Sequence, residues 1–509
     1  MGYIYGRDYE YVRTTSKKYK DGVLLTNDVG RWCFLSKSEY EKYTFKDLDK
    51  ALFDKLESTN MLITDDSIGS YTHQFNDYHW VLSKGTSLHI IIPTLRCNLT
   101  CRYCYAYRAP EDKEGVDMTG ETMDKTIDFI FSTPSETYNL EFSGGEPLIR
   151  FDLVKRAILR ATKLSKEKSK NIQISIITNG TMLTKEIIDF FREHKVGICL
   201  SLDGPQDIHD ANRRFTMGNR PSYQAVVDTI NWLKEEGCPS LNALPVIVRD
   251  SLPIWKDIVD EYISHGFTVM SFKYVSRFGF ASRSWDKMSY TAEEYLEAWK
   301  KVVDYMIQQN KKGIQIVEHL TAVIIHKFAT GLNANYAEMT TPCGAVTGQL
   351  VYDYDGSIYT CDEARTMDEF RIGNVFSSTY KELLDHEATK ALKSASDLSS
   401  YHCDSGCPWF AFCGICPLEV YAEEKGFLTN IASNYRHKIH EGMFEFLMDK
   451  ILHNPEEKDI LYRWLKVRPG IAGSSELESE NVNIFSDYAK SYRMEEAIKD
   501  SYGSSEGYR

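Results

Sequence analysis

The chain of 509 residues lacks features that would place it among nucleic-acid-binding, membrane or secreted proteins. Basic residues are not in excess: 60 Lys and Arg stand against 73 Asp and Glu, whereas nucleic-acid binders need a basic surface to replace phosphate counterions. The best apolar run, around residues 88–95, has the length of a strand and not of a membrane span. The N-terminus has no basic segment followed by an apolar core, so no signal peptide is expected. We therefore predict a cytoplasmic protein with neither nucleic-acid nor membrane partners.

Cysteine is the most informative residue type, with twelve in the chain. Disulfide frameworks are typical of short secreted chains, and this chain is neither short nor predicted to be secreted. All but three of the cysteines fall in tight clusters, which in a reducing compartment indicates metal or redox chemistry. The other three, Cys33, Cys199 and Cys238, are predicted to be small buried hydrophobic residues.

The pattern of strands and helices predicts an α/β fold. From about residue 87, strand-like segments alternate with amphipathic helices. Strands separated by helices imply a parallel sheet, either open or closed into a barrel. Thr184 is predicted to cap one helix, and Thr291 with Glu294 to form the capping box of a longer one. The predicted strands are residues 88–93, 139–142, 172–178, 196–203, 242–248 and 268–275.

The chain is predicted to contain further regions on either side of this α/β segment. Near the N-terminus, the pattern of residues 23–26 and 32–35 predicts a hairpin, followed by two short helices that begin at about Lys37 and Asp47. The helical periodicity lapses before Cys343, where a cysteine-rich region begins. We divide the chain into a small N-terminal α+β domain, the α/β segment, a cysteine-rich domain and a helical extension, with the bounds 1–86, 87–330, 331–453 and 454–509.

The strongest motif follows the first predicted strand. Cys97, Cys101 and Cys104 have the spacing C-x3-C-x2-C. Three thiolates on one loop can bind three irons of a [4Fe–4S] cluster, and the fourth iron is then open to a small molecule. Structural zinc is the alternative, but it needs a fourth Cys or His nearby, and the local sequence has none. The carboxyl end of a parallel strand is also where α/β folds bind their ligands.

Small or polar residues stand at the ends of the next three predicted strands. Paired glycines allow the backbone to approach a ligand closely, and Glu146 supplies an anion for an ammonium group. A plain tight turn is the alternative for each position. The residues are Gly144, Gly145 and Glu146 after the second strand, Asn179 after the third, and Ser201 and Asp203 at the end of the fourth.

The cysteine loop, the Gly-Gly-Glu-Pro turn and the strand pattern together resemble the radical S-adenosylmethionine (SAM) enzymes, over about residues 87–320. The resemblance implies a partial (β/α)6 barrel of the TIM type. It implies that Cys97, Cys101 and Cys104 hold a [4Fe–4S] cluster whose open iron chelates SAM. One electron, supplied by an external flavodoxin- or ferredoxin-like donor, then releases a 5′-deoxyadenosyl radical that abstracts hydrogen from the substrate.

The same resemblance implies a set of cofactor-binding residues. Asn179 and Asp203 belong to this set by their positions at strand ends. For Arg213 the assignment has a physical reason, because a guanidinium fork suits a carboxylate; an exposed surface arginine is the alternative. The implied contacts are Tyr103 near the adenine, Gly144, Gly145 and Glu146 at the methionine end, Ser201 at the ribose and Arg213 at the carboxylate.

The second cysteine region resembles the SPASM extension, which holds auxiliary iron–sulfur clusters in peptide- and protein-modifying members of the family. It implies one or two such clusters. The family spaces its second block of cysteines x2, x5, x3, whereas this chain has x3, x5, x2 and lacks the family's last cysteine. Tyr435, His437 or His440 lies near the missing position. The implied ligands are Cys343, Cys361 and Cys416 for an inner cluster, and Cys403, Cys407 and Cys413 for an outer one.

A zinc site made of Cys403, Cys407, Cys413 and Cys416 is the alternative for the second region, because four close thiolates satisfy tetrahedral zinc. Several further stretches resemble the radical SAM maturase of the His-Xaa-Ser peptide system. They include residues 24–30, 140–148 and 351–356. The favoured function is therefore the radical modification of a ribosomally made precursor peptide, by a thioether, a carbon–carbon or other crosslink, or an epimerisation. The alternatives are a sulfatase-maturing enzyme and a non-catalytic iron–sulfur or zinc protein.

Other roles stay open at this level. The N-terminal hairpin is either a leader-peptide recognition unit, which accepts a peptide as an added strand, or a structural cap. Cys199 or Cys238 would serve as the thiol hydrogen donor of an epimerase. No catalytic residue is assigned from the sequence; the candidates for a general base, chosen for proximity to Cys361, are Asp353, Asp355, Asp362 and Glu363.

Overall fold

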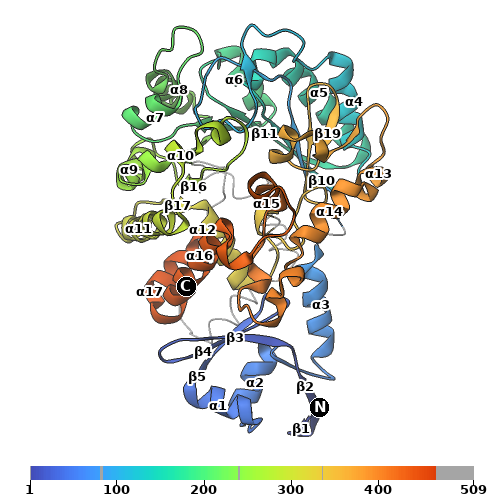
Figure 1. The fold of residues 1–509 in the computed structure, drawn as a ribbon, viewed down its shortest axis with the longest axis vertical. Coiled ribbons are helices and arrows are strands. Elements are labelled where there is room, and N and C mark those ends of the chain that lie inside the picture. Colours follow the sequence, from blue (N-terminus) through green and yellow to red (C-terminus); the bar gives the residue numbers. More distant parts are fainter. Residues whose placement is uncertain (1, 81–83, 239–240, 335, 466–509) are drawn as a thin grey trace.

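The computed structural model describes residues 2–80, 84–238, 241–334 and 336–465, and its central element is a mixed eight-stranded sheet (Figure 1). The strand order is β13-β12-β11-β10-β7-β18-β19-β20. The first five of these strands are parallel, which confirms the predicted α/β character. They are β7 (Leu88–Ile91), β10 (Thr137–Phe142), β11 (Asn171–Thr178), β12 (Gly197–Ser201) and β13 (Leu241–Leu244).

Amphipathic helices connect the parallel strands, as the sequence predicts. Thr184 caps α6 (Lys185–Glu193), whose buried face contains Ile187 and Phe191. The predicted capping box of Thr291 and Glu294 begins the longer helix α11. The helices of this region are α4 (Gly120–Ile130), α5 (Phe151–Lys168), α6, α7 (Gln206–Asn212), α8 (Tyr223–Glu235), α9 (Trp255–Ser264), α10 (Trp285–Met288) and α11 (Ala292–Lys311).

The predictions of single strands at residues 242–248 and 268–275 are wrong, because each segment is interrupted. Pro245 has no amide hydrogen and separates β13 from β14 (Val246–Ile247). In the second segment, the amide of Phe272 donates to Glu318 Oε1 at 3.2 Å instead of to a neighbouring strand. The pieces pair separately, β14 with β16 and β15 with the unpredicted β17, with the bounds β15 (Val269–Met270), β16 (Lys273–Tyr274) and β17 (Val317–Glu318).

The cysteine-rich region continues the central sheet, which the sequence did not predict. Its first strand, β18 (Gln349–Tyr352), pairs in parallel with β7, and β19 (Ser357–Tyr359) and β20 (Arg371–Asn374) follow antiparallel. His89 Nδ1 and Tyr352 Oη lie 2.9 Å apart in the buried interior of this pairing. The predicted division at residue 330 therefore does not separate two sheets.

The N-terminal region lies at one end of the molecule, at the bottom of Figure 1. The predicted hairpin and the two following helices are confirmed, but the hairpin belongs to a three-stranded antiparallel sheet, and a second such sheet was not predicted. The elements are β1 (Gly2–Ile4), β2 (Arg7–Tyr11) and β6 (Leu62–Thr64) in one sheet, β3 (Thr14–Lys18), β4 (Gly22–Asn27) and β5 (Trp32–Ser36) in the other, and the helices α1 (Lys37–Phe45), α2 (Lys50–Ser58) and α3 (Ile68–Tyr78).

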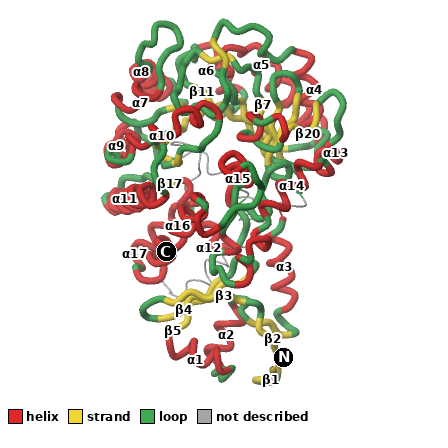
Figure 2. Tube along the Cα trace, viewed as in Figure 1, coloured by secondary structure: helices red, strands yellow, loops and turns green. Residues whose placement is uncertain are grey.

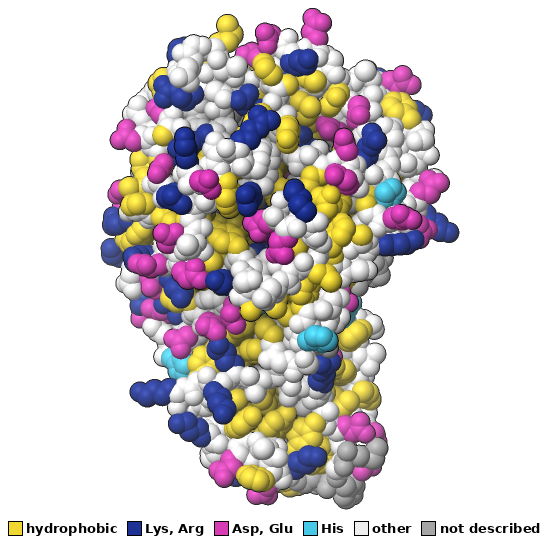
Figure 3. Space-filling view, viewed as in Figure 1, with side chains coloured by type: hydrophobic (Ala, Val, Ile, Leu, Met, Phe, Trp, Pro, Cys, Tyr) yellow, Lys and Arg dark blue, Asp and Glu magenta, His cyan; other side chains and the backbone are white. Residues whose placement is uncertain are grey.

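Helices and long loops fill the middle of the molecule between these two parts (Figure 2). Helix α16 packs along α11 and α12 and carries the positions near the missing cysteine. Among the helices of the described residues, none is both long and apolar enough to cross a bilayer. Basic and acidic side chains are interspersed on the face drawn in Figure 3. The remaining helices are α12 (His319–Thr330), α13 (Tyr380–Asp385), α14 (Glu387–Ser396), α15 (Pro417–Glu424), α16 (Tyr435–His453) and α17 (Pro455–Trp464).

The predicted helical extension 454–509 is described only in its first part. Helix α17 lies there and buries Ile460, Leu461 and Trp464. Residues 466–509, including the Ser-Gly tail, lie outside the described residues.

Candidate active site and metal centres

The loop with Cys97, Cys101 and Cys104 begins after β7 and includes the short strand β8 (Arg96–Cys97), which pairs with β9 (Ala109–Pro110). Cys97 is buried, and the other two thiols are partly exposed. Burial raises the pKa of Cys97, and the neighbouring Cys101 and Cys104 thiols raise this pKa further. The loop therefore brings Cys101 and Cys104 close enough for their charges to act on Cys97.

Two polar anchors hold the cysteine loop. Asp117 accepts hydrogen bonds from Thr94 Oγ1 at 2.6 Å and from Arg96 Nη2 at 2.6 Å. Asn98, inside the C-x3-C segment, accepts a hydrogen bond from Asn179 Nδ2 at 2.8 Å. The sequence analysis missed Asn98, although its place between two cysteines was the available signal. Asn179 thus contacts the cysteine loop, and its contact with a cofactor stays a prediction.

The glycine pair after β10 lies directly against the same loop. Gly144 has φ +123°, and a Cβ on it would lie 2.7 Å from Ile92 Cγ2. A Cβ on Gly145 would lie only 2.1 Å from the carbonyl oxygen of Arg96. The amide of Gly145 also donates to the Thr94 carbonyl at 3.0 Å. The close approach that requires glycine is therefore an approach to the cysteine loop; the expected contact with the methionine end of SAM remains untested.

Glu146 connects the ends of β10 and β11. Its fully buried carboxylate accepts hydrogen bonds from Thr178 Oγ1 at 2.7 Å, the Asn179 amide at 2.9 Å and the Leu148 amide at 3.1 Å. Burial raises the pKa of Glu146 to about 7, although the hydrogen bonds lower it. The carboxylate thus fixes two strand ends, and its role toward an ammonium group stays a prediction.

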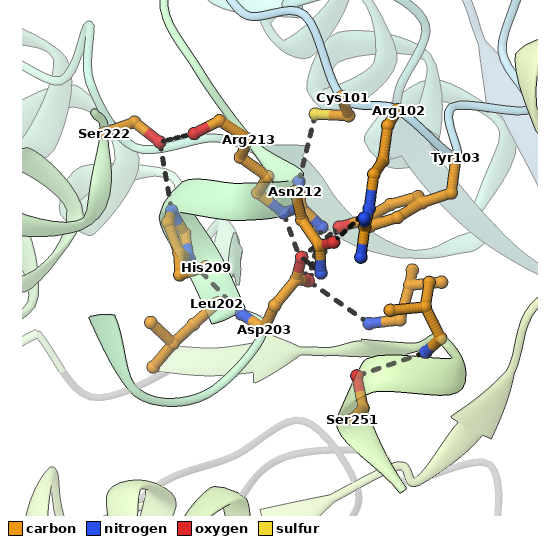
Figure 4. A network of polar contacts seen from close by, with 12 residues as sticks. Cys101, Arg102, Tyr103, Leu202, Asp203, His209, Asn212, Arg213, Ser222 and Ser251 are labelled. Carbon is orange, nitrogen blue, oxygen red and sulfur yellow. Dashed lines mark hydrogen bonds and ion pairs between the residues drawn. The ribbon is translucent and has the colours of Figure 1, made fainter. Parts of the chain in front are cut away.

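Asp203 is the centre of a buried polar network at the end of β12 (Figure 4). Its side chain has no exposed surface. It accepts hydrogen bonds from Tyr103 Oη at 2.7 Å, Asn212 Nδ2 at 2.9 Å and Arg213 Nη2 at 3.1 Å. The amide of Val246 donates to the same carboxylate at 3.3 Å. Asp203 therefore joins the cysteine loop, α7 and β14.

Arg213 lies between this network and the cysteine loop. Only 7% of it is exposed, so the interpretation as an exposed surface arginine is wrong. Its Nη1 lies 3.8 Å from Cys101 Sγ, and its guanidinium lies 5.3 Å from the centre of the Tyr103 ring. Burial raises the pKa of Cys101 to about 11, and Arg213 opposes this increase. Ser201 ends β12 beside Leu244 of β13, and its predicted ribose contact is untested.

The inner cysteine set surrounds one cavity. Burial raises the pKa of Cys361, and Glu363, Cys416 and Cys343 raise it further, so the three thiols are close neighbours. Cys343 precedes β18, Cys361 follows β19, and Cys416 is the residue before α15. The cavity is also lined by Glu338, Gln349 and Glu363.

The outer cysteine set surrounds a second cavity, together with His437 and Glu441. The structure does not bring together the four cysteines of the zinc alternative, because Cys416 lines the inner cavity and Cys403, Cys407 and Cys413 line the outer one. Within the described residues, no three His, Cys, Asp or Glu side chains converge as one metal ion requires. The inner three thiols line one cavity and the outer three line the other.

The candidate bases differ in their surroundings. Asp362, which directly follows Cys361, accepts hydrogen bonds from Tyr105 Oη and from Arg365 Nε. Tyr105 directly follows Cys104, so this contact connects the two cysteine regions. Asp355 binds the Ser357 hydroxyl in the turn between β18 and β19.

Asp353 and Glu363 are the remaining candidates for the general base. Burial raises the pKa of both; a neighbouring carboxylate, Glu338, raises that of Glu363 further, whereas Arg365 opposes the increase for Asp353.

The three cysteines outside the clusters are not equally buried. Cys33 lies in the core of the N-terminal region with 3% exposure, as predicted. Cys199 and Cys238 are only partly buried, so their prediction as buried core residues is wrong. Burial raises the pKa of Cys199 to about 12, and Glu141 raises it further.

Lys327 is a structural residue that the sequence analysis missed. Its amine on α12 is almost fully buried and donates to the carbonyl oxygens of Met339 and Phe412, each at 2.7 Å. These carbonyls lie shortly before Cys343 and directly before Cys413. A charged residue within the apolar run 322–329 was the available signal. Lys327 therefore connects the segments that carry the two cysteine sets.

We expect Lys327→Met to lower the free energy of unfolding by about 1–3 kcal/mol, because two buried carbonyls lose their donor. Chemical denaturation of the metal-free chain measures this change. Lys381→Met, at an exposed position of α13, is the matched control and should leave the unfolding curve unchanged. Equal stability of both variants would contradict the bridging role of Lys327.

Comparisons with known proteins agree on one family. Residues 91–262 match the model of the Radical SAM superfamily. The chain is 30% identical over 315 residues to the serine-type anaerobic sulfatase-maturating enzyme of Bacteroides thetaiotaomicron, covering 57% of this chain and 72% of that protein. It is 26% identical over 345 residues to the antilisterial bacteriocin subtilosin biosynthesis protein AlbA of Bacillus subtilis, covering 67% of this chain and 69% of AlbA.

Solved structures show the same fold. Native anSMEcpe with bound AdoMet superposes with a TM-score of 0.61 and 21% identity, covering 74% of this chain and 99% of that one. Streptococcus suis SuiB bound to the precursor peptide SuiA superposes with a TM-score of 0.50 and 17% identity, covering 81% of this chain and 96% of SuiB.

Proposed function

The chain belongs to the radical SAM superfamily, and on this premise we propose that it modifies a side chain of a ribosomally made peptide. Enzymes of this superfamily use SAM and a [4Fe–4S] cluster, which together supply a radical that abstracts hydrogen. The proposed products are a thioether, a carbon–carbon or other crosslink, or an epimerised residue. An external flavodoxin- or ferredoxin-like protein is the proposed electron donor.

The residues near the first cysteine loop fit these cofactors. Cys97, Cys101 and Cys104 supply three soft sulfur donors on one loop, the ligand type that iron–sulfur clusters use. Arg213 presents a cation beside Cys101. We propose that the remaining cofactor-binding groups are the strand-end residues already described, namely Tyr103, Gly144, Gly145, Glu146, Asn179, Ser201 and Asp203.

The contact between Tyr105 and Asp362 carries the proposal. It joins the residue after Cys104 to the residue after Cys361, so a carboxylate lies between the first cysteine loop and the inner set. A crosslink that forms with loss of two hydrogen atoms gives one of them to the radical; the other leaves as a proton and an electron, which need a base and an electron acceptor. We propose that Asp362 is the base. We propose that the inner auxiliary cluster, held by Cys343, Cys361 and Cys416, is the electron acceptor.

We expect Asp362→Asn to lower the rate of peptide modification about a hundredfold while SAM cleavage continues. The amide keeps the size of the side chain but cannot accept the substrate proton. Asp355→Asn is the control, because the Asp355 carboxylate accepts hydrogen bonds from the amide and the hydroxyl of Ser357 in its own turn. Both products are measured by mass spectrometry of single-turnover reactions. If Asp362→Asn lowers 5′-deoxyadenosine and modified peptide equally, the result would contradict a role of Asp362 as the base alone.

Support for a polypeptide substrate comes from the relatives. A sulfatase-maturating enzyme, a bacteriocin biosynthesis protein and a precursor-peptide complex are all among the similar proteins. We propose the layout of the chain as an N-terminal domain (1–86), a partial barrel (87–330), a SPASM-like domain (331–453) and an extension (454–509).

The N-terminal domain is proposed to recognise a leader peptide. It is attached to the middle region through Thr15 Oγ1, which donates to the Cys407 carbonyl at 3.2 Å, and Trp32 Nε1, which donates to the Phe328 carbonyl at 2.8 Å. Strands β3 and β5 are the two edges of its second sheet, and an edge strand accepts an extended peptide as an additional strand. A purely structural cap would bind no peptide. A binding measurement with precursor peptides therefore distinguishes the two roles of this domain.

Anaerobic co-expression with each short open reading frame beside the gene tests the proposed function. A mass loss of two hydrogens in one peptide indicates a crosslink, and an unchanged mass with deuterium uptake from heavy water indicates epimerisation. Release of 5′-deoxyadenosine with no modified peptide would contradict the proposal.

Sulfatase maturation is the second candidate, because 30% identity connects the chain to a serine-type sulfatase-maturating enzyme. Incubation with sulfatase-derived peptides carrying Ser or Cys distinguishes the two functions. Conversion of either residue to formylglycine would favour this candidate over peptide maturation.

A further inference from the structure

The outer cavity contains a histidine that no family pattern assigns. Its polar lining consists of Cys403, Cys407, Cys413, His437 and Glu441. Apolar side chains complete the wall: Leu398, Trp409, Phe410, Ile431 and Phe444. The three thiols Cys403, Cys407 and Cys413 are neighbours because they line this one cavity. The cavity thus has three sulfur donors, one imidazole and one carboxylate.

A [4Fe–4S] cluster normally takes four protein ligands, and this set has only three thiols. The nearest further cysteine, Cys416, lines the inner cavity instead. We propose that His437 is the fourth ligand of the outer cluster, with Glu441 as the residue that orients it. The inference rests on the proposed function only in taking the outer thiols as cluster ligands.

The other two candidates for the missing ligand lie elsewhere. The ring of Tyr435 packs against Tyr274 of β16, with ring centres 6.1 Å apart. His440 is buried among Arg436, Glu338 and the backbone of Gly414, and its ring centre lies 6.1 Å from that of Phe444. Neither side chain lines the outer cavity. Among the three candidates, the structure therefore selects His437.

The position of His437 on its helix favours ligation. Asn434 caps α16 and accepts a hydrogen bond from the His437 amide at 3.0 Å, which fixes the first turn of the helix. Glu441 lies one turn later, and its Oε2 is 3.7 Å from His437 Nε2. A carboxylate beside a ligating histidine commonly holds the ring in the orientation that the metal requires.

Histidine ligation has a measurable electronic consequence. Exchange of a thiolate for a neutral imidazole removes one negative charge from the cluster, and histidine ligation raises the reduction potential of iron–sulfur centres. The outer cluster is therefore expected to be easier to reduce than a cluster with four thiolates.

The loop between Cys407 and Cys413 lies against the N-terminal sheet, because Thr26 Oγ1 donates to the Pro408 carbonyl at 2.8 Å.

The test uses the full chain with Cys97, Cys101 and Cys104 replaced by alanine, reconstituted anaerobically with iron and sulfide. Pulsed EPR of the reduced protein is expected to show hyperfine coupling to an imidazole nitrogen. His437→Cys should keep the iron content, lose this coupling and show a lower reduction potential. His437→Ala should lose at least one iron and up to about four per chain.

His453→Ala is the matched control on the same helix, because His453 pairs with Asp21 far from the cavity, and it should change neither iron content nor spectrum. Nitrogen coupling that persists in His437→Cys, or full iron content with an unchanged spectrum in His437→Ala, would overturn the proposal. Zinc in place of iron in the outer set would also overturn it. These readouts do not depend on peptide modification, so failure of the proposed function would leave them intact.

Discussion

A variant with Cys97, Cys101 and Cys104 all replaced by alanine is expected to release no 5′-deoxyadenosine from SAM. The three thiols stand on one loop, and burial together with the charges of Cys101 and Cys104 raises the pKa of Cys97. Thiolates are the ligands of such clusters, and their loss should remove about four iron atoms per chain. Iron analysis and chromatography of the SAM products measure both effects.

The same variant should keep its remaining iron. The inner and outer cysteine sets surround separate cavities formed by residues 337–444, and none of the three replaced thiols lines either cavity. Cys33→Ala, in the core of the N-terminal region, is the control and should retain both iron and SAM cleavage. Continued 5′-deoxyadenosine release by the triple variant would contradict the assignment of the first cluster.

Local sequence patterns were sufficient for most of the α/β segment. The apolar strand at 88–91 and the capped helix after Thr184 depend on neighbouring residues, and both formed as predicted. The interruptions at Pro245 and Phe272 were harder to predict. A proline is visible in the sequence, but the amide of Phe272 is satisfied by Glu318, 46 residues further on.

Long-range pairing accounts for what the sequence could not predict about the fold. Strand β18 pairs with β7 across about 260 residues of chain, and a hydrophobic pattern specifies a buried face but not a distant partner. The contact of Tyr105 with Asp362 depends on this pairing, because β7 leads into the loop of Tyr105, and β19, which pairs with β18, leads into the loop of Asp362.

In the candidate sites, too, local sequence predicted the features that depend on neighbouring residues and missed those that depend on distant ones. The spacing of the first three cysteines predicted a shared loop, and the structure brings them together. The glycine pair was expected to approach a ligand, but its closest neighbours belong to the cysteine loop. For the outer set the sequence offered three candidates within six residues, and helical periodicity alone does not tell which of them faces the cavity.

Asp203→Ala is expected to be the most destabilising single substitution near the first cysteine loop. It leaves the Arg213 guanidinium, which is only 7% exposed, without its carboxylate partner, and leaves the hydroxyl of Tyr103 without an acceptor. Removal of one partner from a buried ion pair costs about 3–5 kcal/mol. Asp152→Ala, which breaks the exposed pair with Arg150, is the control and should cost less than about 1 kcal/mol.

The double variant Asp203→Ala with Arg213→Met separates the cost of an unpaired charge from the loss of packing. Without the guanidinium no buried charge lacks a partner, so the double variant should recover part of the stability that Asp203→Ala loses. Burial raises the pKa of Asp203, but the charges of Arg213 and His209 and the hydrogen bonds from Tyr103 and Arg213 together lower it more, and the folded-state pKa ends below the usual value. The carboxylate therefore stabilises the fold above about pH 4, and this contribution falls as the pH decreases toward the folded-state pKa. Denaturant titrations of the metal-free variants at neutral and acid pH measure these differences, and a double variant less stable than Asp203→Ala would show that Arg213 contributes through packing and not through its charge.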